Sequence, residues 1–94
     1  MELKQAFGLA FKELRISKGL SQEAVGASQS YISDLERGIK SPTIEKLAEL
    51  AANMGVHPLT ILARGYLITD ESQTTGELMG QLQKELGELE ARRP

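Results

Sequence analysis

Residues Ser21 to Gly38 read SQEAVGASQSYISDLERG, and this stretch contains the start and stop signals of two short helices. Its first serine is a natural N-cap, and Gly26 ends the first helix after roughly one turn. Ser28 caps a second helix that turns Ile32 and Leu35 toward a core, and the closing glycine ends it. The stretch therefore predicts two helices joined by a tight turn.

The segments on both sides also carry helical patterns. Upstream, apolar residues recur at three- and four-residue steps over about residues 2–18, and Gly19 stands at a typical helix end. Downstream, SPTIEKLAELAANMG predicts a helix between Thr43 and Gly55, and HPLTILARG predicts another that begins at Pro58. The expected buried residues are Leu3, Phe7, Ala10, Phe11 and Leu14, then Ile44, Leu47, Leu50, Ala51 and Met54, and finally Leu59, Ile61 and Leu62.

Residues 1–68 are therefore expected to form one all-α domain of five short helices, with no convincing strand pattern. The apolar run GYLI at its end suits either an extended segment or a hydrophobic linker packed on the core. The polar stretch TDESQTTG that follows indicates a linker, so residues 69–94 are assigned to that linker and a C-terminal helix.

The C-terminal helix is expected to need a partner surface, because an isolated helix of this length is marginal in water. Its apolar residues fall on the a and d positions of two heptads. This pattern suits either a dimer helix or a helix folded back on its own domain. The residues concerned are Met79, Leu82, Leu86 and Leu89.

The composition excludes several classes of protein. The 94 residues include no cysteine, which excludes disulfide frameworks and thiolate metal sites and favours a reducing, cytoplasmic setting. No apolar run approaches the roughly 18 residues that a membrane helix needs. The single histidine, His57, lacks a second metal ligand, and no nucleophile–base pair or phosphate-binding loop is visible. We therefore expect no catalytic residue, no metal, no cofactor and no membrane partner.

The net charge of −2 is unevenly distributed. Residues 1–47 carry seven basic and six acidic residues, whereas residues 48–94 carry four basic and seven acidic ones. The acidity thus lies mainly downstream of residues 21–38. Charge alone neither supports nor forbids binding to nucleic acid.

Four linked segments carry a family resemblance: RISKGLSQ, SQSYISDLERG, the helix after Pro-Thr, and LAANMGVHPLTIL. Over about residues 6–64 the chain resembles the phage-repressor/Cro (XRE) helix-turn-helix family. The resemblance implies a five-helix, repressor-like domain in a transcriptional regulator of bacterial or phage origin, with double-stranded DNA as partner. One departure is that Gln22 and Gly26 enclose three residues where the family usually has about seven, so about one helical turn is missing.

The helix that begins after Ser28 has a composition suited to the major groove. Recognition helices contact base edges through their N-terminal residues, and glutamine can pair bidentately with adenine. The resemblance implies base-facing positions for Gln29, Ser30 and Asp34, and Ser33 is available farther along the same helix. The alternative interpretation is that these residues are cap and solvent residues of a helical domain.

Asp34 has three possible roles. It can accept a hydrogen bond from cytosine N4, which an acidic side chain can read in the major groove. It can orient Arg37, which lies three residues on and so on the same helix face. It can also be merely solvated, in which case its charge repels phosphate.

A second group of residues is expected to contact phosphates: Gln22, Ser28, Tyr31, Arg37 and Lys40. By the resemblance, Gln22 also braces Gln29. Ser28 is equally suited to capping alone, and Tyr31 is equally suited to covering the core with its hydroxyl in water.

Arg15 lies before residues 21–38, and Glu36 lies near their end. The family pattern implies a structural ion pair between them, which ties the first helix to the end of the third. Arginine offers a planar fork for a carboxylate, so such a pair fixes the pose of the DNA-reading helix.

The leading hypothesis is a sequence-specific regulator that binds an inverted-repeat operator as a homodimer, because one small helix reads too few base pairs alone. The alternative is a protein-interaction, antitoxin-like module that kept the fold and reads little DNA. The missing turn and the acidic charge favour the alternative, and the intact SQSYISDLERG stretch opposes it. No small-molecule effector pocket is evident from the sequence, so an effector stays unknown.

Overall fold

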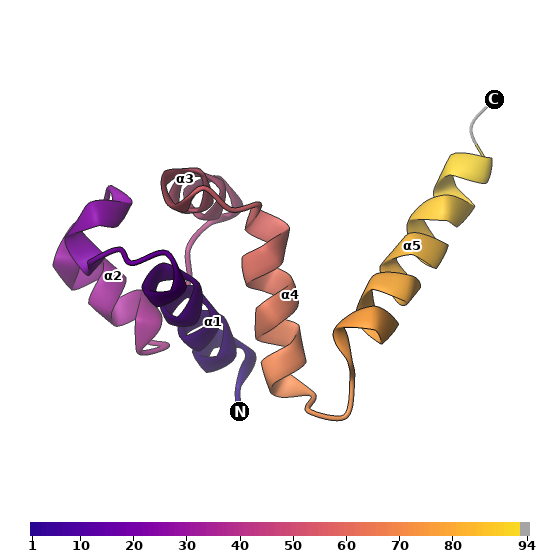
Figure 1. Cartoon of the computed structure of the whole chain (residues 1–94), viewed down its shortest axis with the longest axis horizontal. Coiled ribbons are helices and arrows are strands. Elements are labelled where there is room, and N and C mark those ends of the chain that lie inside the picture. Colours follow the sequence, from indigo (N-terminus) through magenta and orange to yellow (C-terminus); the bar gives the residue numbers. More distant parts are fainter. Residues whose placement is uncertain (93–94) are drawn as a thin grey trace.

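The computed structural model describes residues 1–92, and over that range it contains helices and no strand. The elements are α1 (Leu3–Ser17), the single 3₁₀ turn η1 (Gln22–Val25), α2 (Gln29–Glu36), α3 (Ile44–Met54), α4 (Pro58–Thr69) and α5 (Thr75–Ala91). Helices α1 to α4 pack into one body, and α5 extends away from it beyond a loop (Figure 1). The all-α fold expected from the sequence is confirmed.

Local capping signals explain most helix boundaries. Thr43 Oγ1 accepts a hydrogen bond from the Lys46 amide at 3.1 Å and so begins α3. His57 Nδ1 accepts from the Leu59 amide at 3.0 Å and begins α4. Gly26 has φ 83°, a left-handed conformation that glycine adopts without strain, and it therefore ends η1 after four residues.

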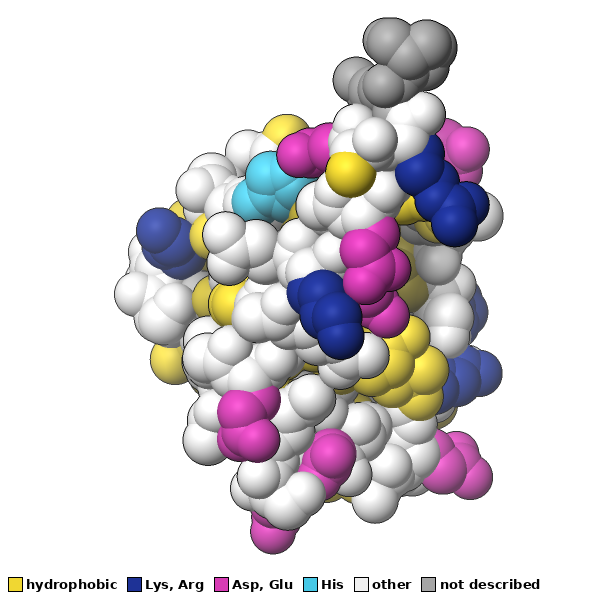
Figure 2. Space-filling view, turned by 90° about the vertical axis from the view of Figure 1, so that its right-hand side faces the viewer, with side chains coloured by type: hydrophobic (Ala, Val, Ile, Leu, Met, Phe, Trp, Pro, Cys, Tyr) yellow, Lys and Arg dark blue, Asp and Glu magenta, His cyan; other side chains and the backbone are white. Residues whose placement is uncertain are grey.

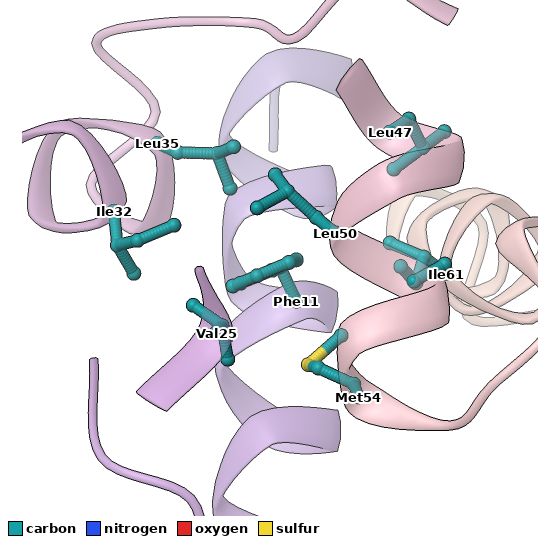
Figure 3. Packing of buried hydrophobic residues seen from close by; sticks show 9 residues of the cluster. Phe11, Val25, Ile32, Leu35, Leu47, Leu50, Met54 and Ile61 are labelled. Atoms are coloured by element: carbon teal, nitrogen blue, oxygen red, sulfur yellow. The ribbon is translucent and has the colours of Figure 1, made fainter. Parts of the chain in front are cut away.

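The core lies between α1, η1, α2, α3 and α4. Phe11 of α1 stands at its centre, with Val25 of η1 on one side and Leu50 and Met54 of α3 on the other (Figure 3). Each such buried side chain contributes roughly 1.5–3 kcal/mol to stability. The residues of the cluster are Phe11, Val25, Ile32, Leu35, Leu47, Leu50, Ala51, Met54 and Ile61.

Three residues expected in the core are exposed instead. Ile44 is 85% exposed, Leu59 is 59% exposed and Leu3 is 40% exposed. All three lie at or next to the first residue of their helices. There the helical period assigns them to the apolar face, but the neighbouring elements do not extend far enough to cover them.

The GYLI run is helical and completes α4, so it is neither extended nor a linker. Gly65 lies against the ring of Phe7, and a Cβ at this position would collide with it. The absence of a side chain lets α4 run close beside α1 to its end at Thr69.

The polar connection between α4 and α5 is correspondingly short and comprises residues 70–74. Helix α5 begins at Thr75 because Thr74 and Glu77 form a capping box. The Glu77 amide donates to Thr74 Oγ1 at 3.1 Å, and the Thr74 amide donates to Glu77 Oε1 at 3.0 Å.

Candidate nucleic-acid interface

Helix α2 presents a polar first turn on the surface. Ser28 Oγ accepts from the Tyr31 amide at 3.1 Å and so caps the helix, which is one of the two roles considered for this residue. Ile32 and Leu35 anchor the opposite face in the core. Gln29 and Ser30 are exposed as a result, while Ser33 and Asp34, farther along, are half-buried.

Arg15 and Glu36 form a bidentate ion pair. Arg15 Nε donates to Glu36 Oε2 at 2.6 Å, and its Nη2 donates to Oε1 at 3.0 Å. The third guanidinium nitrogen, Nη1, donates to the Leu20 carbonyl at 2.8 Å. The pair is largely shielded from water, since the Glu36 side chain is 3% exposed. Through these three hydrogen bonds Arg15 links α1, the loop that follows it and the end of α2.

The hydrogen bond to Glu36 raises the pKa of Arg15 above its ordinary value, although burial of the guanidinium opposes this shift. The arginine is thus charged throughout the physiological range. Its charge belongs to the framework of the domain rather than to a surface that meets a ligand.

Gln22 joins this pair. Its Nε2 donates to Glu36 Oε1 at 3.1 Å, so η1 is tied to the end of α2. Within residues 1–92 the hydrogen bonds include none between Gln22 and Gln29, so the expected brace is not seen here. Gln22 instead lies beside Glu36, whose charged carboxylate is a stronger acceptor than an amide.

Asp34 has a different partner from the one considered from the sequence. Its Oδ2 lies 3.4 Å from Lys40 Nζ, and Arg37 is exposed and stands outside this pair. The amides of Ile39 and Lys40 both donate to the Asp34 carbonyl, at 2.9 and 3.3 Å. This turn after α2 folds the chain back and brings Lys40 beside the carboxylate.

The ring of Tyr31 lies near two lysines. The Nζ atoms of Lys40 and Lys46 are each 5.7 Å from the centre of its ring. At this distance an ammonium group is attracted to the face of the ring. The three side chains form a basic cluster beside the first turn of α2. Lys46 Nζ also lies 3.5 Å from Glu49 Oε2.

Lys46, Gly8 and Asn53 were not singled out from the sequence. Asn53 Nδ2 donates to the Val25 carbonyl at 2.9 Å and covers Gly26, so it fixes the turn before α2. A Cβ on Gly8 would lie 2.8 Å from the Glu36 carbonyl oxygen and closer still to that of Leu35. A glycine inside an amphipathic helix costs up to about 1 kcal/mol and usually has a packing reason, which was the available signal for Gly8.

Helix α5 contains no buried residue. Its heptad residues are exposed, from 39% for Leu82 to 64% for Leu89, with Met79 at 41% and Leu86 at 58%. In this structure α5 is not folded back over its own domain, and its apolar stripe is left uncovered.

Other kinds of site find little support in the described part of the chain. Residues 1–92 contain no group of three or more histidine, cysteine, aspartate or glutamate side chains placed to hold a metal ion. None of the helices in that range is both long and apolar enough to cross a membrane.

Helix α2 is capped by Ser28, follows the glycine turn at Gly26 and is held by the buried Arg15–Glu36 ion pair. The same region of the chain matches a known family. The model of the helix-turn-helix family matches residues 11–61, which cover η1, α2 and α3 and the adjoining parts of α1 and α4. The chain belongs to the XRE-type helix-turn-helix family. This family consists of DNA-binding transcriptional regulators.

Similar proteins, by sequence and by structure, support this membership. The chain is 47% identical over 60 residues to the HTH-type transcriptional regulator y4dJ of Sinorhizobium fredii, a match that covers 60% of this chain and 78% of the relative. Among solved structures, the clp gene regulator ClgR of C. glutamicum superposes with a TM-score of 0.65 at 31% identity over 70% of this chain and 90% of ClgR. The restriction-modification controller protein C.AhdI of Aeromonas hydrophila gives 0.58 at 33% identity over 61% and 92%.

Proposed function

We propose that this helix-turn-helix regulator reads a specific DNA sequence as a homodimer on an inverted repeat, in the cytoplasm of a bacterial cell. The observation that carries the proposal is the exposed first turn of α2, whose polar side chains are accessible to a ligand. Gln29 and Ser30 are both exposed, and the helix behind them is fixed at each end by Ser28 and Glu36.

Base reading is assigned to the face of α2 that includes Gln29, Ser30, Ser33 and Asp34. Gln29 can offer its amide to adenine N6 and N7, and the serines can donate or accept at several bases. Asp34 can accept from cytosine N4 once Lys40 moves from its carboxylate to a phosphate. A lysine 3.4 Å away also reduces the repulsion that Asp34 exerts on DNA.

Phosphate contacts are assigned to Ser28, Tyr31, Arg37 and Lys40, which surround that face. Arg37 and Lys40 supply positive charge, and the Tyr31 hydroxyl supplies a donor. Gln22 keeps one amide hydrogen for a phosphate while the other binds Glu36. Such contacts set the register of the protein on the duplex and carry no sequence information of their own.

Two copies are required because one helix of eight residues reads only a few base pairs. A two-fold dimer that presents one α2 per chain matches an inverted repeat with half-sites about 10–11 base pairs apart, or a multiple of that.

Selection of bound DNA from a random pool tests the proposal. We expect an enriched inverted repeat, and a gel shift in which Gln29→Ala loses about 1–3 kcal/mol of operator affinity. Gln83→Ala, an exposed residue of α5 outside the lining of the groove between α4 and α5, is the matched control and should bind as the native chain does. A single asymmetric box bound by a monomer would overturn the dimer, and the absence of any enriched sequence would favour the partner-binding alternative.

A further inference from the structure

Helix α5 has little support within a single chain. None of its residues is buried, Leu78 is half-buried, and a capping box stabilises its start. A lone helix of 17 residues with glycines in its interior is marginal in water. The ordered helix therefore implies a surface that covers its apolar stripe.

The surface opposite this stripe is an apolar groove of about 1170 Å³ between α4 and α5. Leu62, Tyr66 and Leu67 line it from α4, and Leu78, Met79 and Leu82 line it from α5. Figure 1 shows the two helices diverging from the loop that joins them. Viewed from the α5 side, acidic and basic side chains are scattered over the surface and hydrophobic ones show between them (Figure 2).

The stripe of α5 is too small to form a stable dimer by itself. Burying one leucine or methionine removes on the order of 100 Å² of apolar surface from water. The four heptad residues thus supply about 400 Å² per chain, roughly half of the ~800 Å² per partner that specific interfaces bury. The α4 wall of the groove must contribute if the interface is to reach that size.

Charge also opposes a simple parallel pair of α5 helices. In the heptad frame of Met79, Glu85 occupies a g position and Glu90 the following e position. These positions face each other across a parallel two-stranded coiled coil, and there they would place like charges together on both sides of the seam. A helix placed in the groove also meets the α4 wall, where Arg64 supplies a basic side chain.

We propose that α5 of a second copy of this chain fills the groove between α4 and α5, and that the two copies do so reciprocally. The exchange closes on itself about a two-fold axis, so it yields a dimer rather than a filament. It rests on the homodimer of the proposed function and places that dimer's interface. Each stripe is then covered on one side by the partner's α4 and on the other by the partner's α5.

Sedimentation equilibrium of the full chain gives the first test. The native chain should be a dimer, and Leu86→Glu should raise the dimer dissociation constant by about thirtyfold or more, as expected for a central interface residue. Ala91→Glu adds the same charge at an f position of the same helix and should leave the constant within about twofold. A monomeric native chain, or equal effects of the two variants, would overturn the proposal.

Cross-linking separates the groove from an α5–α5 zipper. The chain has no cysteine, so Tyr66→Cys on α4 and Leu82→Cys on α5 can be made as single variants, mixed and treated with a short bis-maleimide. A covalent heterodimer between the two variants is the expected product. A product between two Leu82→Cys chains alone would overturn the groove arrangement.

The same samples distinguish failure of the interface from failure of the proposed function. A dimer that cross-links through the groove but enriches no DNA sequence would sink the DNA-reading proposal and leave this interface standing. A chain that binds its operator but gives no cross-link between Tyr66→Cys and Leu82→Cys would overturn the groove interface and leave the DNA-reading proposal standing.

Discussion

At the scale of residues, Glu36 and Asp34 show how two acids on one short helix acquire different roles. Glu36 has a 3% exposed side chain and accepts from both Arg15 and Gln22. Asp34 is 27% exposed, and its nearest cation, Lys40, is 51% exposed and so free to exchange partners. The first acid is therefore part of the framework, and the second is available for recognition.

Arg15→Ala and Glu36→Ala should each lower the free energy of unfolding by about 3–5 kcal/mol, because each leaves a buried charge without its partner. The double variant should lose less than the sum of the two. The raised pKa of Arg15 makes its contribution complete below the pKa of an unfolded arginine, so the effect should be constant near neutral pH. Urea denaturation followed by circular dichroism measures these values.

Arg64 and Glu13 provide the matched control for that cycle. They form the same kind of pair at 3.0 Å between α4 and α1, but their side chains are 48% and 39% exposed. Removing either should cost no more than about 1 kcal/mol. Equal losses for the buried and the exposed pair would contradict the framework role of Arg15 and Glu36.

Asp34→Ala should weaken operator binding and abolish the preference for cytosine at one position, with a cost of about 1–3 kcal/mol. Lys40→Ala should instead weaken all sequences about equally and flatten the salt dependence. Titrations against operators with each of the four bases at that position, at several salt concentrations, separate the two effects. Uniformly tighter binding by Asp34→Ala would show that its charge only repels DNA.

At the scale of elements, the pose of α2 depends on how closely α1 approaches its end. Gly8 lies against the carbonyl groups of Leu35 and Glu36, and backbone atoms cannot move aside as a flexible side chain can. The close approach lets Arg15, two turns farther along α1, reach Glu36 and Leu20 at the same time.

Gly8→Ala should lower the free energy of unfolding by about 1–3 kcal/mol through overpacking, despite the higher helix propensity of alanine. Gly80→Ala in α5 is the matched control, since a Cβ there meets nothing within 4 Å. It should raise the helix content measured by circular dichroism. A stabilised Gly8→Ala variant would show that α1 and α2 can separate at no cost.

Most elements could be predicted from local signals, whereas contacts between elements could not. The caps of Ser28 and Thr43 and the glycine at residue 26 mark where α2 and α3 begin and where η1 ends, so these boundaries were accessible. Ser21, expected to cap the helix that it precedes, makes no side-chain cap hydrogen bond. The exposed state of Ile44 depends on where neighbouring helices stop, which the helical period of α3 does not contain. The pairing of Asp34 with Lys40 likewise depends on the turn after α2, and no helical spacing relates two residues six apart across a helix end.

At the scale of the whole molecule, the chain divides into a packed body, residues 3–69, and a projecting helix. All the buried hydrophobic residues belong to the body. Residues 70–94 should therefore affect assembly much more than folding.

Deletion of residues 70–94 should leave the helical body folded with a cooperative thermal transition, and should convert the proposed dimer to a monomer. Operator affinity should fall with dimerisation, because each half-site would then be bound independently. Analytical ultracentrifugation and a gel shift measure the two effects. A truncated chain that remains a dimer would place the interface on the exposed residues at the start of α3 and α4.

An uncovered α5 also makes the behaviour of the regulator depend on its abundance. If α5 forms the proposed interface, then at low protein concentration the segment from Thr75 to Ala91 lacks a partner, and we expect it to fray and become a substrate for proteases. The proposed dimer should protect this segment, so we expect degradation to remove single chains before paired ones. The concentration of active protein should thus rise more steeply than the rate of its synthesis, and an operator occupied by pairs would respond with a threshold.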